Sequence, residues 1–89
     1  METQIKGVLA GARKLRELIS SDVKTFEKDD EYFIVGISES PLSCSERSEI
    51  IDKVLDEAYK YVDSLYLTVL IVNNESYKQI RENLGKEID

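Results

Sequence analysis

Residues 66–72 read Tyr-Leu-Thr-Val-Leu-Ile-Val, the most apolar and β-branched run in the chain. A run of this length and composition, followed at once by Asn73-Asn74, is typical of a buried β-strand. Side chains alternate between the two faces of a strand. Both alternating sets are largely apolar here, with Leu67, Val69 and Ile71 on one face and Tyr66, Leu70 and Val72 on the other. The stretch therefore predicts a strand inside a sheet that is covered on both sides.

A helix and a hairpin precede this strand in the sequence. Residues 3–20 carry apolar side chains at the spacing of an amphipathic helix. Residues 22–27 and 31–38 predict two strands joined by a tight turn at Lys28-Asp29-Asp30, because aspartate tolerates the unusual dihedrals of such turns. Val23 and Phe26 are out of phase in the first strand, which indicates a bulge or an edge position.

Two further helices follow the hairpin. Ser43 and Glu46 have the spacing of a capping box, which predicts the start of a long helix over residues 44–63. Asn73-Asn74-Glu75 is expected to cap a last helix, and Gly85 is its expected C-terminal stop.

The order of these elements predicts a single α+β domain over residues 1–89, an αββαβα two-layer sandwich with a three-stranded sheet. The helix 44–63 acts as a crossover, which returns the strand 66–72 either parallel to residues 31–38 or antiparallel beside residues 22–27. The two long helices would cover one face of the sheet. The other face needs the last helix or a partner subunit. Exposed sheet edges in so small a domain favour self-association.

Two glycines lie four residues apart on the first helix. Gly7 and Gly11 each cost about 1 kcal/mol relative to alanine in a helix interior, so a specific reason for them is expected. They indicate either a close approach of this helix to the sheet or to another helix, or the seam of a dimer.

Composition excludes several function classes. The chain carries a net charge of −6, and nine acids against three bases lie between Asp22 and Asp52. This acidity disfavours nucleic acid, which requires a basic surface. The chain has no histidine and a single cysteine, so it lacks Ser-His and Cys-His dyads, cysteine-based zinc sites and internal disulfides. Because these catalytic residues are lacking, we expect a protein that is not an enzyme. With no targeting segment and no apolar run of membrane-spanning length, we also expect a cytoplasmic protein that is not membrane-bound.

The helix, the hairpin from Asp22 to Ser38, the serine-rich entry to the next helix and the apolar strand Tyr66 to Val72 resemble small αββαβ modules. These include BON-type domains, the ring-building motifs of secretion and sporulation proteins, and the soluble domain of spore lipoproteins. The glycines that such modules often carry are replaced here by Lys28-Asp29-Asp30 and Asp63-Ser64. The resemblance implies a non-enzymatic packing or assembly module. Several small archaeal proteins share the same element order.

Four sets of residues are candidate sites. Carboxylates are the ligands that Ca²⁺ or Mg²⁺ prefers, so the acidic hairpin turn predicts a weak cation site at Glu27, Asp29, Asp30 and Glu31. The first helix offers an anion patch, or a docking surface for another subunit's acidic turn, at Lys6, Arg13, Lys14 and Arg16. The thiol of Cys44 is expected in the first turn of the second helix, without a base beside it. Among the tyrosines, we expect Tyr59, Tyr61 and Tyr66 to line the core and its rim, and Tyr32 and Tyr77 to cap the ends of the sheet.

The leading hypothesis is a non-catalytic module for interaction with a protein partner or with itself, as a homo-oligomer. The alternative is a protein that binds Ca²⁺ or Mg²⁺ through the turn 27–31. A second alternative is an acidic inhibitor of a basic, nucleic-acid-handling partner, with the surface from Asp22 to Asp52 in place of a phosphate chain.

Overall fold

The computed structural model describes residues 2–19, 22–39, 41–62 and 65–88. Four strands form one open sheet in the order β3-β2-β1-β4. The elements are α1 (Glu2–Ile19), β1 (Asp22–Lys28), β2 (Glu31–Ile37), α2 (Cys44–Ala58), β3 (Leu67–Val72), α3 (Asn74–Ile80), the 3-10 helix η1 (Arg81–Asn83) and β4 (Lys86–Glu87). The α+β class and the predicted order of the first six elements are confirmed.

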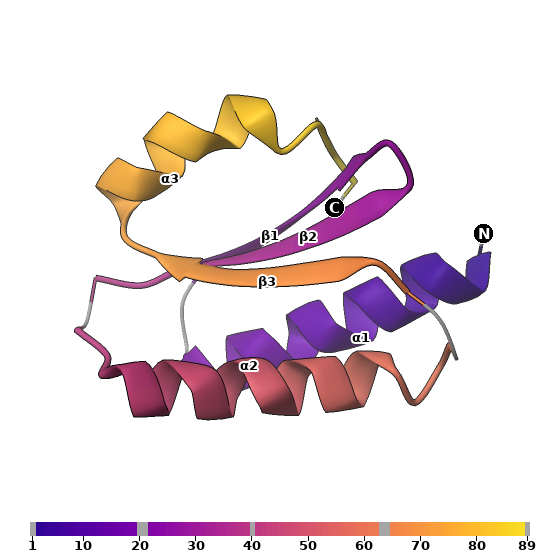
Figure 1. Ribbon diagram of the computed structural model, residues 1–89, viewed down its shortest axis with the longest axis horizontal. Coiled ribbons are helices and arrows are strands. Elements are labelled where there is room, and N and C mark those ends of the chain that lie inside the picture. The colour runs from indigo at the N-terminus through magenta and orange to yellow at the C-terminus, as the bar shows by residue number, and fades with distance from the viewer. Residues whose placement is uncertain (1, 20–21, 40, 63–64, 89) are drawn as a thin grey trace.

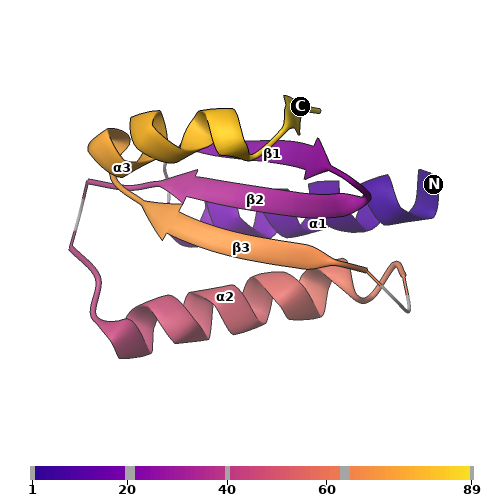
Figure 2. The same ribbon diagram turned by 45° about the horizontal axis from the view of Figure 1, so that its top comes forward.

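The strand predicted inside the sheet from residues 66–72 is β3, and the interior position is wrong because β3 lies at a border of the sheet. Crossover through α2 returns β3 parallel to β2, with Ile34 opposite Val69 in the register. An antiparallel position beside β1, which the sequence had left open, is therefore wrong. Figure 2 shows β3 along one border of the sheet, with α2 running below it.

Two parts of the predicted architecture are wrong. The sheet has four strands rather than three, because Lys86–Glu87 pairs with Phe26 and Glu27 of β1. These two residues are both charged, so no apolar alternation predicts a strand here. Gly85, at φ 90°, turns the chain back toward β1. The two-layer description is also wrong, because α3 covers the second face of the sheet, which is one of the two alternatives that the sequence left open. In Figure 1, α1 and α2 lie on one side of the sheet and α3 on the other.

Each face of the sheet has its own apolar cluster. On the α1 and α2 side the cluster includes Val8, Leu15, Val23, Tyr32, Ile34, Val54, Val69 and Ile71. On the α3 side it includes Phe26, Val35, Ile37 and Leu84, with Leu70, Val72 and Tyr77 packed against them. The apolar alternation on both faces of β3 thus reflects cover on both sides, as predicted.

The two clusters also explain the irregular pattern of the first strand. Val23 packs on the α1 and α2 side and Phe26 on the α3 side. The register from Asp22 opposite Ile37 to Lys28 opposite Glu31 is unbroken. The predicted bulge is therefore wrong, because both phases of β1 have a core to enter.

Local signals for turns and caps are largely confirmed. Asp29 and Asp30 have φ of 51° and 67°, as a two-residue type I′ hairpin requires. The Glu46 N–H donates to Ser43 Oγ at 3.1 Å and the Ser43 N–H to Glu46 Oε1 at 3.0 Å, which completes the capping box. Helix α2 ends at Ala58, earlier than the predicted 63, because the apolar pattern continues into a turn from which Val62 packs on the same core.

The two helical glycines mark an internal contact. Gly7 and Gly11 are buried where α1 packs against α2 and the sheet. A Cβ at Gly7 would lie 2.9 Å from the backbone oxygen of Ala58 and 3.0 Å from Val62 Cγ1. A Cβ at Gly11 would lie 2.9 Å from Ile34 Cδ1. The glycines therefore serve the close approach within one chain, and the dimer seam predicted as their alternative is wrong.

The different neighbours of these glycines give a paired prediction. Gly7→Ala should lower the free energy of unfolding by about 1 kcal/mol or more, because a backbone carbonyl cannot move aside as a side chain does. The Cβ added in Gly11→Ala meets the end of the Ile34 side chain, which can move aside. Both variants gain the same helix propensity, so Gly11→Ala should lower the free energy of unfolding clearly less than Gly7→Ala. Urea denaturation of both variants measures the difference. Equal stability of the two, or a Gly7→Ala variant more stable than the parent, would contradict the packing described.

One polar side chain lies in the core without a partner. Thr25 is fully buried in β1, and its hydroxyl has no hydrogen-bond partner among the described residues. The Thr25 carbonyl, in contrast, accepts from the N–H of Ile88 at 2.9 Å. A buried hydroxyl without a partner is destabilising by about 1–3 kcal/mol.

Thr25→Val should therefore raise the free energy of unfolding by about 1 kcal/mol, because it replaces the hydroxyl with a methyl of similar size. Thr25→Ser is the matched control. It keeps the hydroxyl and loses the methyl, so it should lower stability by about 1 kcal/mol. Thermal and urea unfolding measure both, and a Thr25→Val variant less stable than the parent would show that the hydroxyl is satisfied.

Candidate functional site

The outer border of β3 exposes main-chain groups without a strand partner. The N–H of Tyr32 donates to the Tyr66 carbonyl at 2.8 Å, and the N–H of Ser38 donates to the Val72 carbonyl at 2.8 Å. Backbone groups of successive strand residues point to opposite edges, so the even-numbered residues of β3 face β2. The N–H and C=O groups of Leu67, Val69 and Ile71 therefore point away from the sheet, where β3 has no neighbouring strand among the described residues. We call these three residues the outer row of β3.

This border carries no charge. From Leu65 to Val72 the sequence contains no Asp, Glu, Lys or Arg and no proline. Thr68 is exposed and Leu70 half-buried on the α3 side. Tyr66, just before the strand, is 74% exposed. Natural sheets usually protect an edge with charges, proline or bulges, so a bare edge of this kind is open to an added strand.

The opposite border of the sheet is built differently. There β1 is partly covered by the two-residue strand β4. Lys24 lies 3.9 Å from Glu87 in an ion pair, and the Lys28 ammonium donates to the Asn83 carbonyl at 3.3 Å. Short length and charged side chains are the usual protection of an edge strand. Within the part of the chain that the structure describes, the β3 border is therefore the more apolar and the less protected of the two sheet borders.

A hollow of about 220 Å³ lies at the carboxyl ends of β2 and β3, where ligands often bind in sheets with parallel strands. Its lining is Ser38, Glu39, Pro41, Leu42, Arg47, Ile71, Val72 and Asn73. Glu39 accepts from the Asn74 N–H at 3.2 Å and from Asn74 Nδ2 at 2.8 Å, so its carboxylate ties the loop after β2 to the start of α3. The chain has no histidine to activate the Ser38 hydroxyl. This arrangement provides charges of both signs but no recognisable reaction centre.

The acidic residues predicted to bind a cation do not converge. Asp29 and Asp30 form the exposed hairpin turn. Glu27 lies opposite Tyr32 in the register, whereas Glu31 is its neighbour in the chain, so the two glutamates point to opposite faces of the sheet. Within the described ranges, no three His, Cys, Asp or Glu side chains are grouped closely enough to hold a metal ion. No observation here favours the cation hypothesis for Glu27, Asp29, Asp30 and Glu31, which stays a prediction.

The turn does affect one buried tyrosine. Tyr32 is only 2% exposed, in the cluster on the α1 and α2 side. Burial raises the pKa of its phenol, and the nearby charges of Glu27 and Asp30 and a hydrogen bond with Glu27 raise it further. Tyr32 was expected at an end of the sheet; it is the second residue of β2, and its ring lies in the core.

Three other tyrosines depart from expectation. Tyr59, Tyr61 and Tyr66 were expected at the core and its rim, but all three are exposed. Tyr59 and Tyr61 follow the end of α2, and the Tyr59 hydroxyl donates to the Leu65 carbonyl at 3.0 Å, which fixes the entry to β3. Tyr77 packs under α3 with its ring 6.4 Å from that of Phe26. Exposure of these rings leaves apolar surface at one end of the domain.

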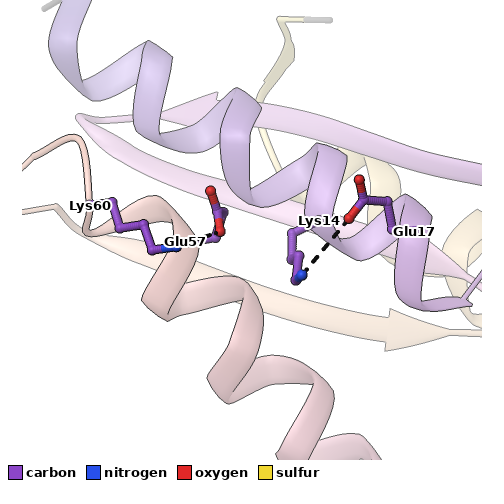
Figure 3. Close-up of polar contacts among 4 residues, drawn as sticks. All are labelled: Lys14, Glu17, Glu57 and Lys60. Carbon is purple, nitrogen blue, oxygen red and sulfur yellow. Dashed lines mark hydrogen bonds and ion pairs between the residues drawn. The ribbon is translucent and has the colours of Figure 1, made fainter.

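The basic residues of α1 are not one patch. Lys14 pairs with Glu17 at 3.9 Å, and Arg16 donates to the Val23 carbonyl at 3.2 Å. Figure 3 shows Lys14 with Glu17 on α1, and Glu57 near the end of α2 with Lys60 in the turn that follows; each lysine pairs with the acid three residues away. Lys6 and Arg13 line a separate hollow of about 260 Å³ with Leu9, Ala10 and Tyr61. Exposed ion pairs such as Lys14–Glu17 and Lys60–Glu57 contribute little to the free energy of unfolding.

Cys44 is the first residue of α2, as predicted from the capping box, and it is exposed. None of the described residues brings a histidine near it, since the chain has none. The geometry gives this thiol no catalytic partner.

No protein-family model, curated protein or solved structure matches this chain. The resemblance to BON-type and ring-building modules therefore rests on element order and stays a prediction. Among the described helices, none combines the length and the apolar character needed to cross a bilayer. The cytoplasmic location expected from the sequence also stays a prediction.

The raised pKa of Tyr32 predicts a pH dependence. In the unfolded chain the phenol ionises near its ordinary pKa of 10.0, whereas in the folded chain it stays protonated to higher pH. Stability is therefore fully present below pH 10 and is lost as the pH rises toward the folded-state pKa. Tyr32→Phe should flatten the fall in unfolding free energy above pH 10, and Tyr66→Phe, at the exposed ring, should leave it unchanged. Urea titrations from pH 8 to 11 measure this, and parallel curves for parent and Tyr32→Phe would contradict it.

Proposed function

We propose that this chain is a non-catalytic protein-interaction module that binds an extended segment by adding it as a strand to the open border of β3. One observation supports it above the others. The outer row Leu67, Val69 and Ile71 presents N–H and C=O groups that pair with no other strand among the described residues, on a strand without charge. In strand addition, such main-chain groups supply affinity and the alternate side chains supply specificity.

The form of the partner follows from the same geometry. An added strand would extend the parallel pair β2 and β3, with its side chains alternating between the α2 side and the α3 side. On the α3 side it would meet the exposed Tyr66 and Thr68 and the half-buried Leu70. A hollow of about 240 Å³ lined by Glu31, Leu65, Tyr66, Leu67 and Thr68 lies at the start of this border. The expected ligand is an apolar, uncharged extended segment.

Other functions receive less support. The sequence has no histidine, which removes the Ser-His and Cys-His dyads of common hydrolases. Seven of the nine acids between Asp22 and Asp52 fall into two groups, one at the hairpin turn and one on the first half of α2, and Asp22 and Glu39 lie outside both. Figure 1 places these two elements at opposite ends of the domain. This separation gives no continuous acidic track of the kind that a phosphate mimic needs.

The test is strand addition in trans. A synthetic peptide with the sequence of residues 66–72 and soluble flanking lysines should shift the amide resonances of Leu67, Val69 and Ile71 in a saturable way. The matched control is the same peptide with alternate backbone nitrogens methylated, which retains the side chains and cannot form a ladder. It should bind at least about tenfold more weakly, as the loss of several main-chain hydrogen bonds requires. Equal binding of both peptides, or shifts confined to other elements, would overturn the proposal.

A further inference from the structure

We infer that the segment added to β3 is the same border of a second copy, paired antiparallel about a two-fold axis at Val69. This inference rests on the proposed function and names the partner. The result would be a dimer in which the two sheets form one continuous sheet, with β3 of each chain at its centre. Self-association was expected from the sequence, but the surface and register come from the structure.

The main-chain groups of the border are self-complementary. The outer row is symmetric about Val69, with Leu67 and Ile71 two residues to either side. In an antiparallel copy, Val69 exchanges N–H···O bonds with its own equivalent, and Leu67 exchanges them with Ile71. Every outward N–H and C=O of the row is then satisfied. A two-fold contact of this kind is closed, so it ends at a dimer.

The side chains are compatible with this register. On the α3 side, the exposed ring of Tyr66 lies opposite the half-buried Val72 of the copy, and Thr68 lies opposite Leu70. An aromatic ring opposite a β-branched side chain is a favourable cross-strand pair. The most exposed apolar ring of the chain and the incompletely covered end of β3 therefore cover each other.

Charge selects the antiparallel direction. No charged residue lies between Leu65 and Val72, so the paired strands oppose no like charges. The acidic hairpin turn, with Asp29 and Asp30, joins β2 at the end where β3 begins. Antiparallel pairing puts the two acidic turns at opposite ends of the joined sheet, whereas parallel pairing would put them side by side. The short, charged β4 protects the far border against further growth.

Amide hydrogen exchange on the full chain tests the inference, with sedimentation on the same samples. The amides of Thr68, Leu70 and Val72 face β2 and should be protected at every concentration. The amides of Leu67, Val69 and Ile71 should exchange quickly at low concentration. At a total chain concentration ten times the dimer dissociation constant, about a fifth of the chains remain monomeric, so these amides should slow by roughly fivefold. The even-numbered amides serve as the internal control.

A pair of variants separates this surface from any other. In the proposed register the two copies of Thr68 are diagonal neighbours across the axis, so Thr68→Lys places like charges close together. Thr68→Lys should weaken dimerisation by at least about tenfold, and Gln79→Lys, which adds the same charge on the exposed part of α3, should leave it unchanged.

The possible results distinguish failure of this inference from failure of the proposed function. A dimer whose outer-row amides stay unprotected, or one insensitive to Thr68→Lys, uses another surface and overturns the inference. A monomer at high micromolar concentration that still adds the peptide of residues 66–72 overturns the inference and leaves the proposed function standing. A monomer that binds neither a copy nor the peptide overturns both.

Discussion

Parallel pairing of β2 with β3 is the constraint on which the rest of this fold depends. A parallel pair needs a long crossover, and here α2 supplies it and at the same time covers one face of the sheet. Both faces of β2 and β3 are apolar, so one layer of helices is insufficient. Helix α3, seven residues long, completes the cover on the second face. The crossover through α2 places β3 on the side of β2 away from β1. There, β3 is a border strand, and its outer row has no strand partner among the described residues.

Close packing of α1 makes this arrangement compact. Gly7 and Gly11 let α1 approach α2 and the sheet, and Gly36 lets Leu15 and Ile19 lie against β2. Helix α1 contacts β1 and β2, whereas α2 contacts β3. Among the described residues, β3 is a border strand of the sheet.

Much of this architecture is predictable from the sequence because its signals are local. Ser43 with Glu46 marks a helix start, Asp29 and Asp30 mark a hairpin, and the alternation around Val69 marks a strand covered on both faces. Each signal comes from a side chain acting within a few residues. The crossover helix predicted before β3 also limits the positions that β3 can take, although the sequence leaves open whether β1 or β2 is its neighbour.

The missed features depend on distant contacts. Strand β4 is two charged residues, and only the turn at Gly85 brings them to β1. The phase of Val23 and Phe26 looks irregular until both faces of β1 are known to have a core. The candidate site shows the same limit. Composition identified an uncharged strand, but an edge strand and a central strand read alike in sequence, since both are apolar on two faces. The carboxylates around the turn seemed to converge in sequence, yet strand alternation separates Glu27 from Glu31.

The position of β3 as a border strand is the central claim, and backbone NOEs of the isotope-labelled protein measure it most directly. At concentrations where sedimentation shows a monomer, the account predicts a parallel pattern between β2 and β3, in the register that places Ile34 opposite Val69. It predicts no interstrand NOE from the other side of β3. Antiparallel NOEs between β3 and β1, or NOEs to strands on both sides of β3 in the monomer, would contradict it.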